Sequence, residues 1–451
     1  MAGGSGGSGG SGGTTTAAAC SLRDRQNWAF QQLSEWYLFY DTLPASLDPT
    51  PYATVGDYVD ALTATARAQG HDRYFTYLTS IAEEDAYYAS GSSAGFGIRL
   101  SYDAAARRVF VAEAFEGTTA LAAGIDRGAE ILAIGTSSAD LRSVSSIIAA
   151  QGADGITNAL GPNTAGTTRV LRVADAAGTR DLTVAKADYE LTPVSSRYGA
   201  RIIDDGGHKV GYVNLRTFIS TADPALRDAF ARFRAAGVAD VIVDLRYNGG
   251  GLVSIAELMA NLLGGNRSAA DVFTYTSFRP SKSAENSTET FVPQPQSIAP
   301  ARIAFIGTGG TASASELVIN GFIPYLHAGA ALIGTNTYGK PVGQIALDRS
   351  QCDDRLRVIA FAKQNASHQG AYYSGLAGTI ASCRAGDDIA HPMGDPAEAS
   401  TRAALDFVEG RACAAGAIGA GGQGALSLSP QRELLIPDRP DTAQREVPGL
   451  F

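Results

Sequence analysis

The sequence predicts an α/β fold with a largely parallel sheet, preceded by a β-rich domain and a helical segment. Strand-like and helix-like stretches alternate from about residue 194, short β segments gather from about residue 94, and aromatic residues recur at helical spacing before them. Alternation of strand and helix is typical of βαβ units, whose strands run parallel. We therefore divide the chain into a linker (1–20), an N-terminal helical domain (21–93), a β-rich domain (94–190), an α/β domain (191–412) and a flexible tail (413–451).

Composition excludes two classes of partner. The chain of 451 residues has a net charge of −9, and no basic stripe is interleaved with aromatic residues, so nucleic acid is not an expected partner. No apolar run approaches the roughly 20 residues that cross a bilayer, so no membrane span is expected.

The first 20 residues read as a flexible Gly/Ser linker, without the charged and apolar regions of a secretory signal. A tether behind a removed signal peptide, a tether behind a lipid anchor and an expression linker all fit this text. The tail over 413–451 combines a Gly-rich tract with four prolines and shows no period, which predicts loose order.

The helical domain is predicted from two stretches, RDRQNWAFQQLSEWYLFYDTL and TVGDYVDALTATARAQGHDRYFTYL, separated by the Pro-rich PASLDPTPY. Apolar and aromatic residues at helical spacing are typical of a packed core. We assign Trp28 and Trp36 to such packing, not to ligand binding.

The β-rich domain begins with GFGIRLSYD, followed by RRVFVAEAF, ILAIG, TTRVLRVAD and DLTVAKADYEL. Together with EGTTALAAGIDRG, these segments resemble a PDZ domain. The resemblance implies that the backbone N–H groups of Phe96, Gly97 and Ile98 hold the end of a peptide that adds as a strand to the sheet. On local sequence alone, Gly95 and Gly97 would only relax a strand corner.

The α/β domain is predicted from four strands, KVGYVNLRTF, ADVIVDLRYN, ARIAFIGT and ALIGTNTYG, with helical stretches between them. DVIVDL and RIAFIG are nearly continuous apolar runs, as expected for strands covered on both faces.

Ser313 stands between strand ARIAFIGT and the helical stretch SELVINGF, and two interpretations fit it. Ser-Ala-Ser-Glu from residue 313 is the sequence of a capping box, which favours a helix cap. A serine on an exposed turn at the positive end of a helix can equally act as a nucleophile. Ser315 is a lesser candidate, because a hydroxyl deeper in the helix tends to bond a backbone carbonyl.

A serine nucleophile needs a base. None of the five histidines follows a strand with a paired acid, whereas Lys340 lies in TYGKPVGQ at the end of an apolar strand. A lysine accepts a proton only when it is neutral, which burial favours. Most lysines in loops are solvated surface groups, and that interpretation stands beside the catalytic one. Gln344 is placed to orient the amine by a hydrogen bond.

A glycine loop, Asn248-Gly249-Gly250-Gly251, follows the buried strand DVIVDLRY. Glycines there allow backbone N–H groups to face a substrate carbonyl, although a turn that only ends the strand has the same sequence.

Taken together, DLRYNGGGLV, GTASASELV and TYGKPVGQ resemble the signature segments of the C-terminal processing peptidases, also called tail-specific proteases. The resemblance implies a ClpP/crotonase-like α/β catalytic domain with Ser313 as nucleophile, Lys340 as base and Gln344 as the residue that orients it. It also implies an oxyanion hole formed by the N–H groups of Gly250 and Ala314, and no metal or cofactor. The sequence departs from the family at Gly249, where proline is common, and at Pro341, where glycine is usual.

The resemblance predicts a serine endopeptidase that recognises the free C-terminal tail of a protein or peptide substrate. Two alternatives use the same fold: a catalytically silent scaffold that binds tails, and a carrier of an apolar small molecule. The sequence does not indicate an oligomeric state.

The four cysteines show no CxxC spacing and can pair in three ways. The expected bridge joins Cys352 to Cys383, which flank a strand-rich segment. A disulfide implies an oxidising compartment outside the cytoplasm, such as a bacterial periplasm or outer surface.

Overall fold

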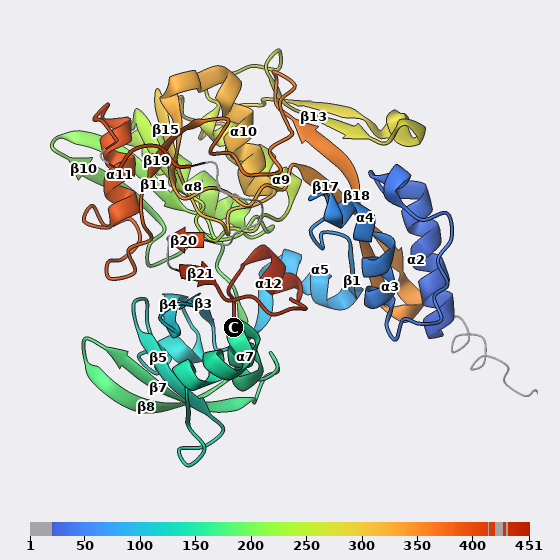
Figure 1. Ribbon diagram of the computed structural model, residues 1–451. Coiled ribbons are helices and arrows are strands. Elements are labelled where there is room, and N and C mark those ends of the chain that lie inside the picture. Colours follow the sequence, from blue (N-terminus) through green and yellow to red (C-terminus); the bar gives the residue numbers. More distant parts are fainter. Residues whose placement is uncertain (1–19, 414, 420–426, 430–431) are drawn as a thin grey trace, which may run out of the picture. The chain divides into compact units, whose positions relative to one another are not determined.

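The computed structural model describes residues 20–413, 415–419, 427–429 and 432–451 (Figure 1). The chain divides into two compact units. Unit 1 combines the N-terminal residues up to Glu84 with 277–286 and 342–362, and unit 2 contains the rest. Apart from Cys20, the expected linker lies outside the described residues. Among the residues described, no helix is both long and apolar enough to cross a membrane.

Unit 1 contains the expected N-terminal helices. Their bounds are α2 (Leu22–Trp36), α3 (Val55–Leu62) and α4 (Ala64–Ala68). The hydroxyls of Ser21 and Thr54 accept N–H groups in the first turns of α2 and α3, which satisfies donors that the helix itself leaves unpaired.

A sheet of distant segments completes unit 1. Three of its five strands are β1 (Tyr77–Ser80), β17 (Val342–Arg349) and β18 (Asp354–Gln364), and β18 pairs antiparallel with both others. The α/β domain predicted from the sequence therefore gives a hairpin to the N-terminal unit. Helix α5 (Ile81–Ser90) follows β1 along the chain.

The β-rich part of unit 2 is an antiparallel sheet with the strand order β20-β21-β3-β4-β5-β7-β8, and β6 pairs with β5. Its bounds are β3 (Ile98–Asp103), β4 (Arg108–Ala114), β5 (Glu130–Gly135), β6 (Arg142–Ser143), β7 (Thr168–Asp175), β8 (Gly178–Ala185), β20 (Ser427–Ser429) and β21 (Arg432–Leu434). Helices α6 (Thr119–Ala122) and α7 (Val144–Leu160) lie between its strands in sequence, and β2 (Ser92–Gly95) pairs with β9 (Ala187–Glu190). Alternate residues of the strands, such as Ile98, Leu100 and Val111, form its apolar core.

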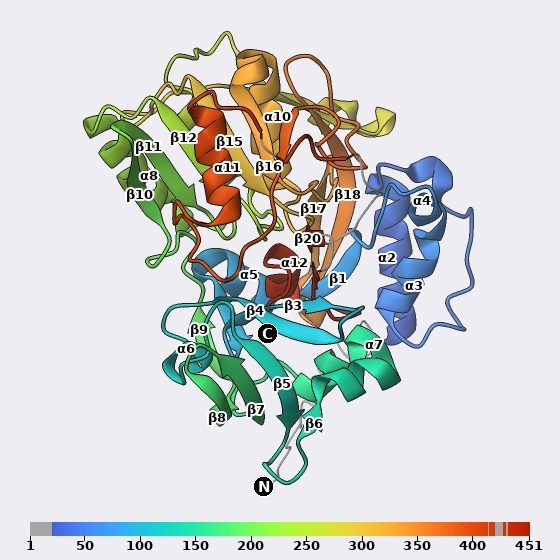
Figure 2. The ribbon, with the colours of Figure 1, turned by 60° about the vertical axis from the view of Figure 1, so that its left-hand side comes forward.

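The α/β part of unit 2 is a six-stranded sheet in the order β10-β11-β12-β15-β16-β19 (Figure 2). All neighbours run parallel except β10 and β11. The strands are β10 (Ala200–Asp205), β11 (His208–Asn214), β12 (Asp240–Asp244), β15 (Arg302–Gly307), β16 (Ala330–Gly334) and β19 (Ala381–Arg384). The mixed α/β class predicted from the sequence is confirmed.

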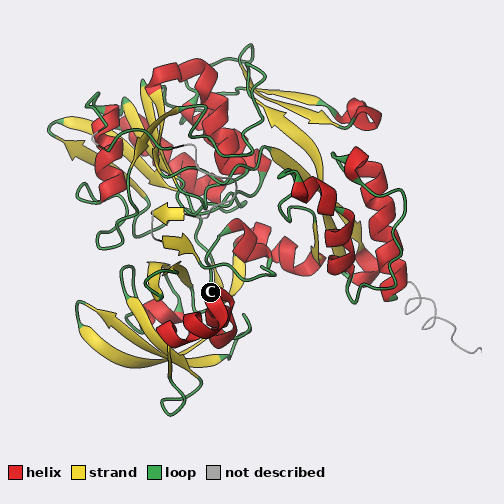
Figure 3. Ribbon diagram, in the orientation of Figure 1, coloured by secondary structure: helices red, strands yellow, loops and turns green. Residues whose placement is uncertain are grey.

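Helices cover both faces of this sheet, as Figure 3 shows. Helices α8 (Ala222–Ala235), α9 (Val253–Leu263) and α10 (Ala314–Leu326) share one apolar core with Val241 and Phe305, and α11 (Ala399–Val408) packs on Ile242 and Ala304 of the opposite face. Every residue of β12 is buried, which explains its continuous apolar run. A hairpin of β13 (Val272–Phe278) and β14 (Ser287–Thr290) lies between α9 and β15 in sequence.

The prediction of a flexible tail is wrong for residues 432–451. Beyond β21, this region forms α12 (Thr442–Glu446), which has a capping box between Asp441 and Gln444. Leu434, Val447 and Phe451 are buried. The apolar residues of this region are too few for a periodic pattern, yet all except the partly buried Ile436 are buried. Residues 414, 420–426 and 430–431 of the predicted tail lie outside the described residues.

The predicted Cys352–Cys383 bridge is also wrong. The structure pairs Cys20 with Cys352 and Cys383 with Cys413. Cys352 follows β17 in unit 1, whereas Cys383 lies on β19 in unit 2. Nearness in sequence is misleading here, because the two strand-rich stretches belong to different sheets.

Candidate active site

Ser313 lies on the turn between β15 and α10, and it is half-buried. Its backbone has φ 54° and ψ −114°, a region that a residue with a side chain rarely adopts. Strained backbone of this kind is found at functional sites, where surrounding contacts hold it in place. The predicted position of the serine, at the entrance of a helix, agrees with the structure.

Glu316 joins the Ser313 turn to the loop that carries Lys340. Its fully buried carboxylate accepts the N–H of Ser313 at 3.1 Å and the N–H of Lys340 at 2.7 Å, both on Oε2, and the N–H of Gly339 at 2.7 Å on Oε1. Burial raises the pKa of Glu316, against hydrogen bonds from Thr337 and from these three backbone groups. Because one oxygen serves both residues, the backbones of Ser313 and Lys340 lie close together.

Lys340 follows β16 in the sequence and is half-buried. The glycine before it is required: Gly339 has φ 89°, and a Cβ there would lie 2.3 Å from the carbonyl oxygen of Tyr373. Gln344 lies on β17 in unit 1, and its side-chain amide donates a hydrogen bond to the carbonyl of Phe75. Its role in orienting the lysine stays a prediction.

The glycine loop after β12 packs against the serine. A Cβ on Gly250, which has φ 125°, would lie 2.8 Å from the Cβ of Ser313. The Gly250 N–H donates to the side-chain oxygen of Asn248 at 3.0 Å, and the Gly249 N–H donates to the carbonyl of Glu446 at 2.9 Å. Ala314 is the first residue of α10, so the helix offers no acceptor for its N–H.

Ser315 has a structural contact instead of an exposed hydroxyl. It is fully buried, and its Oγ donates to the carbonyl of Asn248 at 3.0 Å. The bond to a backbone carbonyl agrees with the sequence-based expectation, and it ties α10 to the glycine loop.

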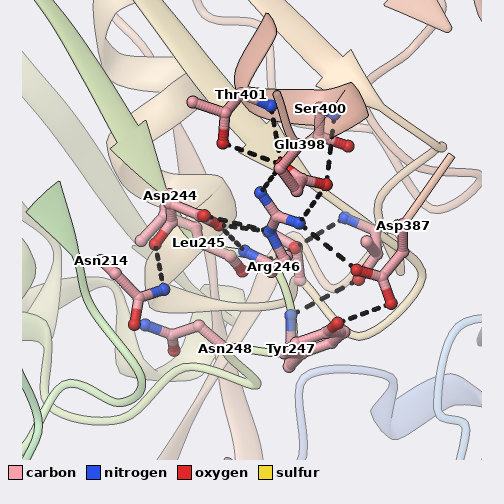
Figure 4. Close-up of polar contacts among 12 residues, drawn as sticks. Asn214, Asp244, Leu245, Arg246, Tyr247, Asn248, Asp387, Glu398, Ser400 and Thr401 are labelled. Carbon is pink, nitrogen blue, oxygen red and sulfur yellow. Dashed lines mark hydrogen bonds and ion pairs between the residues drawn. The ribbon is translucent and has the colours of Figure 1, made fainter. Parts of the chain in front are cut away.

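A buried ion network supports the glycine loop, as Figure 4 shows. Arg246 is fully buried; its Nε bonds both carboxylate oxygens of Asp244 at 3.0 Å, and its two terminal nitrogens bond Glu398 at 2.9 Å each. Asp387 accepts from Arg246 at 3.3 Å and from the hydroxyl of Tyr247 at 2.6 Å. Breaking one member of such a network leaves a buried charge uncompensated.

Sequence reasoning missed this network. The sequence does place an acid and an arginine at the end of the apolar run DVIVDLRY. Because buried charges must be paired, these two residues could have indicated a buried ion network. Burial opposes the ionised form of Asp387, but the charges of Arg127 and Arg246 outweigh it and lower its pKa. Burial raises the pKa of Asp244 in spite of Arg246.

The three residues predicted to bind a peptide lie just before and at the start of β3. The N–H groups of Gly97 and Ile98 donate to the carbonyl oxygen of Phe451 at 3.0 and 3.1 Å, and the carbonyl of Phe96 accepts the N–H of Ala120. Gly97 has φ 75°, and a Cβ there would lie 2.1 Å from the Thr118 side chain, so only glycine fits.

Comparisons with known proteins agree with these observations. Residues 24–77 match the "Peptidase S41 N-terminal domain" and residues 209–375 match "Peptidase family S41". The chain is 25% identical over 319 residues to carboxyl-terminal-processing peptidase 1, chloroplastic, of Arabidopsis thaliana, covering 67% of this chain and 60% of that protein. It is 30% identical over 179 residues to the chloroplastic C-terminal processing peptidase of Tetradesmus obliquus, covering 38% and 36%. The chain thus spans 60% or less of the length of these curated relatives.

A solved structure shares the fold. A protein from Bacteroides fragilis NCTC 9343, named for the S41 proteases, superimposes with a TM-score of 0.65 at 22% identity, covering 85% of this chain and 97% of that one. At this identity the superposition shows a shared fold, and the matches to the peptidase family S41 domains cover residues 24–77 and 209–375 of the chain.

Proposed function

We propose that the protein is a serine endopeptidase in which Ser313 is the nucleophile and Lys340 the general base. The observation that carries this proposal is the bridge made by Glu316, whose single Oε2 atom accepts the N–H groups of both residues. A nucleophile and its base must lie within reach of each other, and this shared contact fixes their two segments together.

The chemistry is acyl transfer. Neutral Lys340 takes the proton of the Ser313 hydroxyl as its oxygen attacks a peptide carbonyl, and the protonated amine then gives that proton to the leaving nitrogen. Water hydrolyses the resulting ester and restores the serine. Gln344 orients the lysine amine in this mechanism.

The oxyanion is stabilised by the N–H groups of Ala314 and Gly250. In this structure the Gly250 N–H is donated to Asn248 at 3.0 Å. Catalysis therefore requires that this N–H exchange the Asn248 oxygen for the substrate oxyanion.

The β-rich domain over residues 94–190 acts as a PDZ domain in this proposal. A substrate tail adds as a strand beside β3, with its end held by the N–H groups near Phe96, Gly97 and Ile98. The sheet geometry and the positions of these N–H groups support that role.

We also propose that the protein works in an oxidising compartment. All four cysteines lie among the described residues and are paired, as expected outside the cytoplasm. A bacterial periplasm or outer surface fits best.

The test is cleavage of an unstructured protein by the wild type and by two serine variants. Ser313→Ala should lower kcat/KM by at least about 10³-fold, because the nucleophile is lost. Ser315→Ala removes the neighbouring hydroxyl and should keep measurable turnover. Equal activity of Ser313→Ala and the wild type would contradict the nucleophile assignment, and no cleavage by any of the three would favour a tail-binding scaffold.

A further inference from the structure

The last three residues of the sequence pair with the first half of β3, and β21 pairs with its second half at Ser101 and Tyr102. Leu100 donates its N–H to the carbonyl of Gly449 at 2.8 Å, Phe451 donates to Ile98 at 2.9 Å, and Leu450 pairs antiparallel with Arg99. The carbonyl oxygen of Phe451 accepts two further N–H groups, those of Gly97 and Ile98. Backbone pairing of this kind is how a peptide joins a sheet edge.

Phe451 packs into the apolar core of the β-rich domain. Only 2% of it is exposed, and it belongs to the same core cluster as Phe96 and Ile98. The backbone is equally close: a Cβ on Gly95 would lie 2.7 Å from the carbonyl carbon of Phe451. The groove beside β3 therefore accepts a large aromatic side chain. It also brings the backbone of the bound segment against Gly95.

The same segment reaches the glycine loop of the candidate active site. The carbonyl of Glu446, at the end of α12, accepts the N–H of Gly249 at 2.9 Å, and the Glu446 carboxylate accepts the hydroxyl of Tyr88 at 2.9 Å. Only Val447 and Pro448 lie between Glu446, whose carbonyl contacts the glycine loop, and Gly449, whose carbonyl contacts β3. In Figure 1 the C-terminal end of the chain lies beside β3, and α12 leads into it.

We propose that segment 447–451 is an intramolecular ligand of the peptide groove. It occupies the place of a substrate tail and must leave before a tail can bind. The groove accordingly accepts a large apolar side chain, such as phenylalanine, at the position of Phe451. This inference rests on the proposed function, in which the β-rich domain captures tails.

The physical consequence is competition. A tethered ligand acts at an effective concentration in the millimolar range, so a free peptide of micromolar affinity binds poorly while the segment is in place. The apparent affinity equals the intrinsic affinity multiplied by the fraction of molecules in which the groove is open. The alternative is a permanent strand, which shields the edge of β3 and never leaves.

The experiment measures binding of a fluorescent peptide, EVPGLF, to the Ser313→Ala protein by anisotropy. This background removes cleavage, so the result does not depend on catalysis. Phe451→Asp places a charge in the apolar core and should open the groove, tightening peptide binding at least about tenfold. Val292→Asp, which adds the same charge at a side chain that is 56% exposed, should leave the affinity unchanged.

Two further variants secure the interpretation. A chain shortened to Pro448 should show the same gain as Phe451→Asp. Gly95→Ala added to the shortened chain should remove the gain, because the peptide then meets the new Cβ. Binding that is equally weak in the full-length, Phe451→Asp and shortened proteins, all folded, would overturn the proposal. So would melting of both tail variants more than about 10 °C below the parent, the result expected of a permanent strand.

Discussion

Glu316 holds the geometry of the proposed active site at the scale of single residues. Its carboxylate accepts N–H groups from the serine turn and from the lysine loop, two segments that the sequence separates by more than twenty residues. A carboxylate has about four acceptor positions on its two oxygens. They suffice for these three backbone donors together with the side chain of Thr337.

Replacement of Glu316 by glutamine tests this positioning role. The variant keeps the size but replaces one acceptor oxygen with an NH₂ donor that faces N–H groups. We expect kcat to fall about 10–100-fold, because the catalytic groups lose their alignment. KM should be nearly unchanged, because Glu316 does not contact the peptide groove on β3. Steady-state kinetics on an unstructured protein measures this. The exposed Glu190→Gln is the matched control, and an unchanged kcat in Glu316→Gln would refute the role.

Residues of the site differ in how well the sequence predicts them. Ser313 and Lys340 stand in short segments whose chemistry can be interpreted locally. Arg246 cannot be understood in that way, because its partner Glu398 lies 152 positions later in the chain. The sequence shows only that a charge follows an apolar strand, and the fold supplies the partner.

At the scale of elements, the turn into β3 depends on glycine. Gly97 combines φ 75° with a clash of its added Cβ against Thr118 at 2.1 Å. Gly117 has nearly the same φ, 77°, with open space around the position of a Cβ. Comparing Gly97 with Gly117 therefore separates the free-energy cost of a positive φ from the free-energy cost of the steric clash.

Alanine substitutions at these two glycines give a direct comparison. Gly117→Ala should cost about 1 kcal/mol of unfolding free energy, the cost of positive φ in a residue with a Cβ. Gly97→Ala should cost at least about 2 kcal/mol more, because the side chain of Thr118 must be displaced. Urea denaturation monitored by fluorescence measures both values, and equal losses would show that the turn tolerates a Cβ.

Long periodic elements were predicted well, whereas short ones were not. The apolar run of β12 and the amphipathic α8 have signals of their own. Helix α12 has five residues and β21 has three, too few for any period to show. Their burial comes from contacts with distant parts of unit 2, which local sequence does not record.

At the scale of the whole unit 2, buried ion pairs connect the β-rich sheet to the α/β part. Arg216, which follows β11, bonds Glu113 of β4 at 2.7 Å and Glu116 at 2.7 Å. Burial alone would raise the pKa of Glu116, but the charge and hydrogen bond of Arg216 outweigh it and lower the pKa to about 2. Folding is therefore linked to the ionisation of Glu116.

The sign of this linkage predicts an acid-dependent stability. The folded pKa of about 2 lies below the ordinary 4.5, so Glu116 contributes stability above pH 4.5 that is lost as the pH falls toward 2. The contribution is at most about 3 kcal/mol, and less because the side chain is partly exposed. Melting curves between pH 3 and 7 should show a shallower pH dependence in Glu116→Gln than in the wild type. Identical slopes would contradict the linkage.

Domain boundaries at this scale were predicted only in part. The sequence divides the chain into consecutive segments, whereas unit 1 takes β17 and part of β18 from beyond residue 340. The same non-local pairing explains the cysteines: Cys352 lies next to β17 and bridges to Cys20 in the same unit. Pairing between strands that are hundreds of residues apart leaves no local signal.

The most direct test of the central claim, a Ser313–Lys340 peptidase, is the kcat/KM of Lys340→Met on an unstructured protein. We expect a loss of at least about 10³-fold, as in Ser313→Ala, because the serine has no other base. Lys209→Met, at an exposed lysine of β11, should match the wild type. Full activity of Lys340→Met would contradict the account and return the search for the base to the histidines.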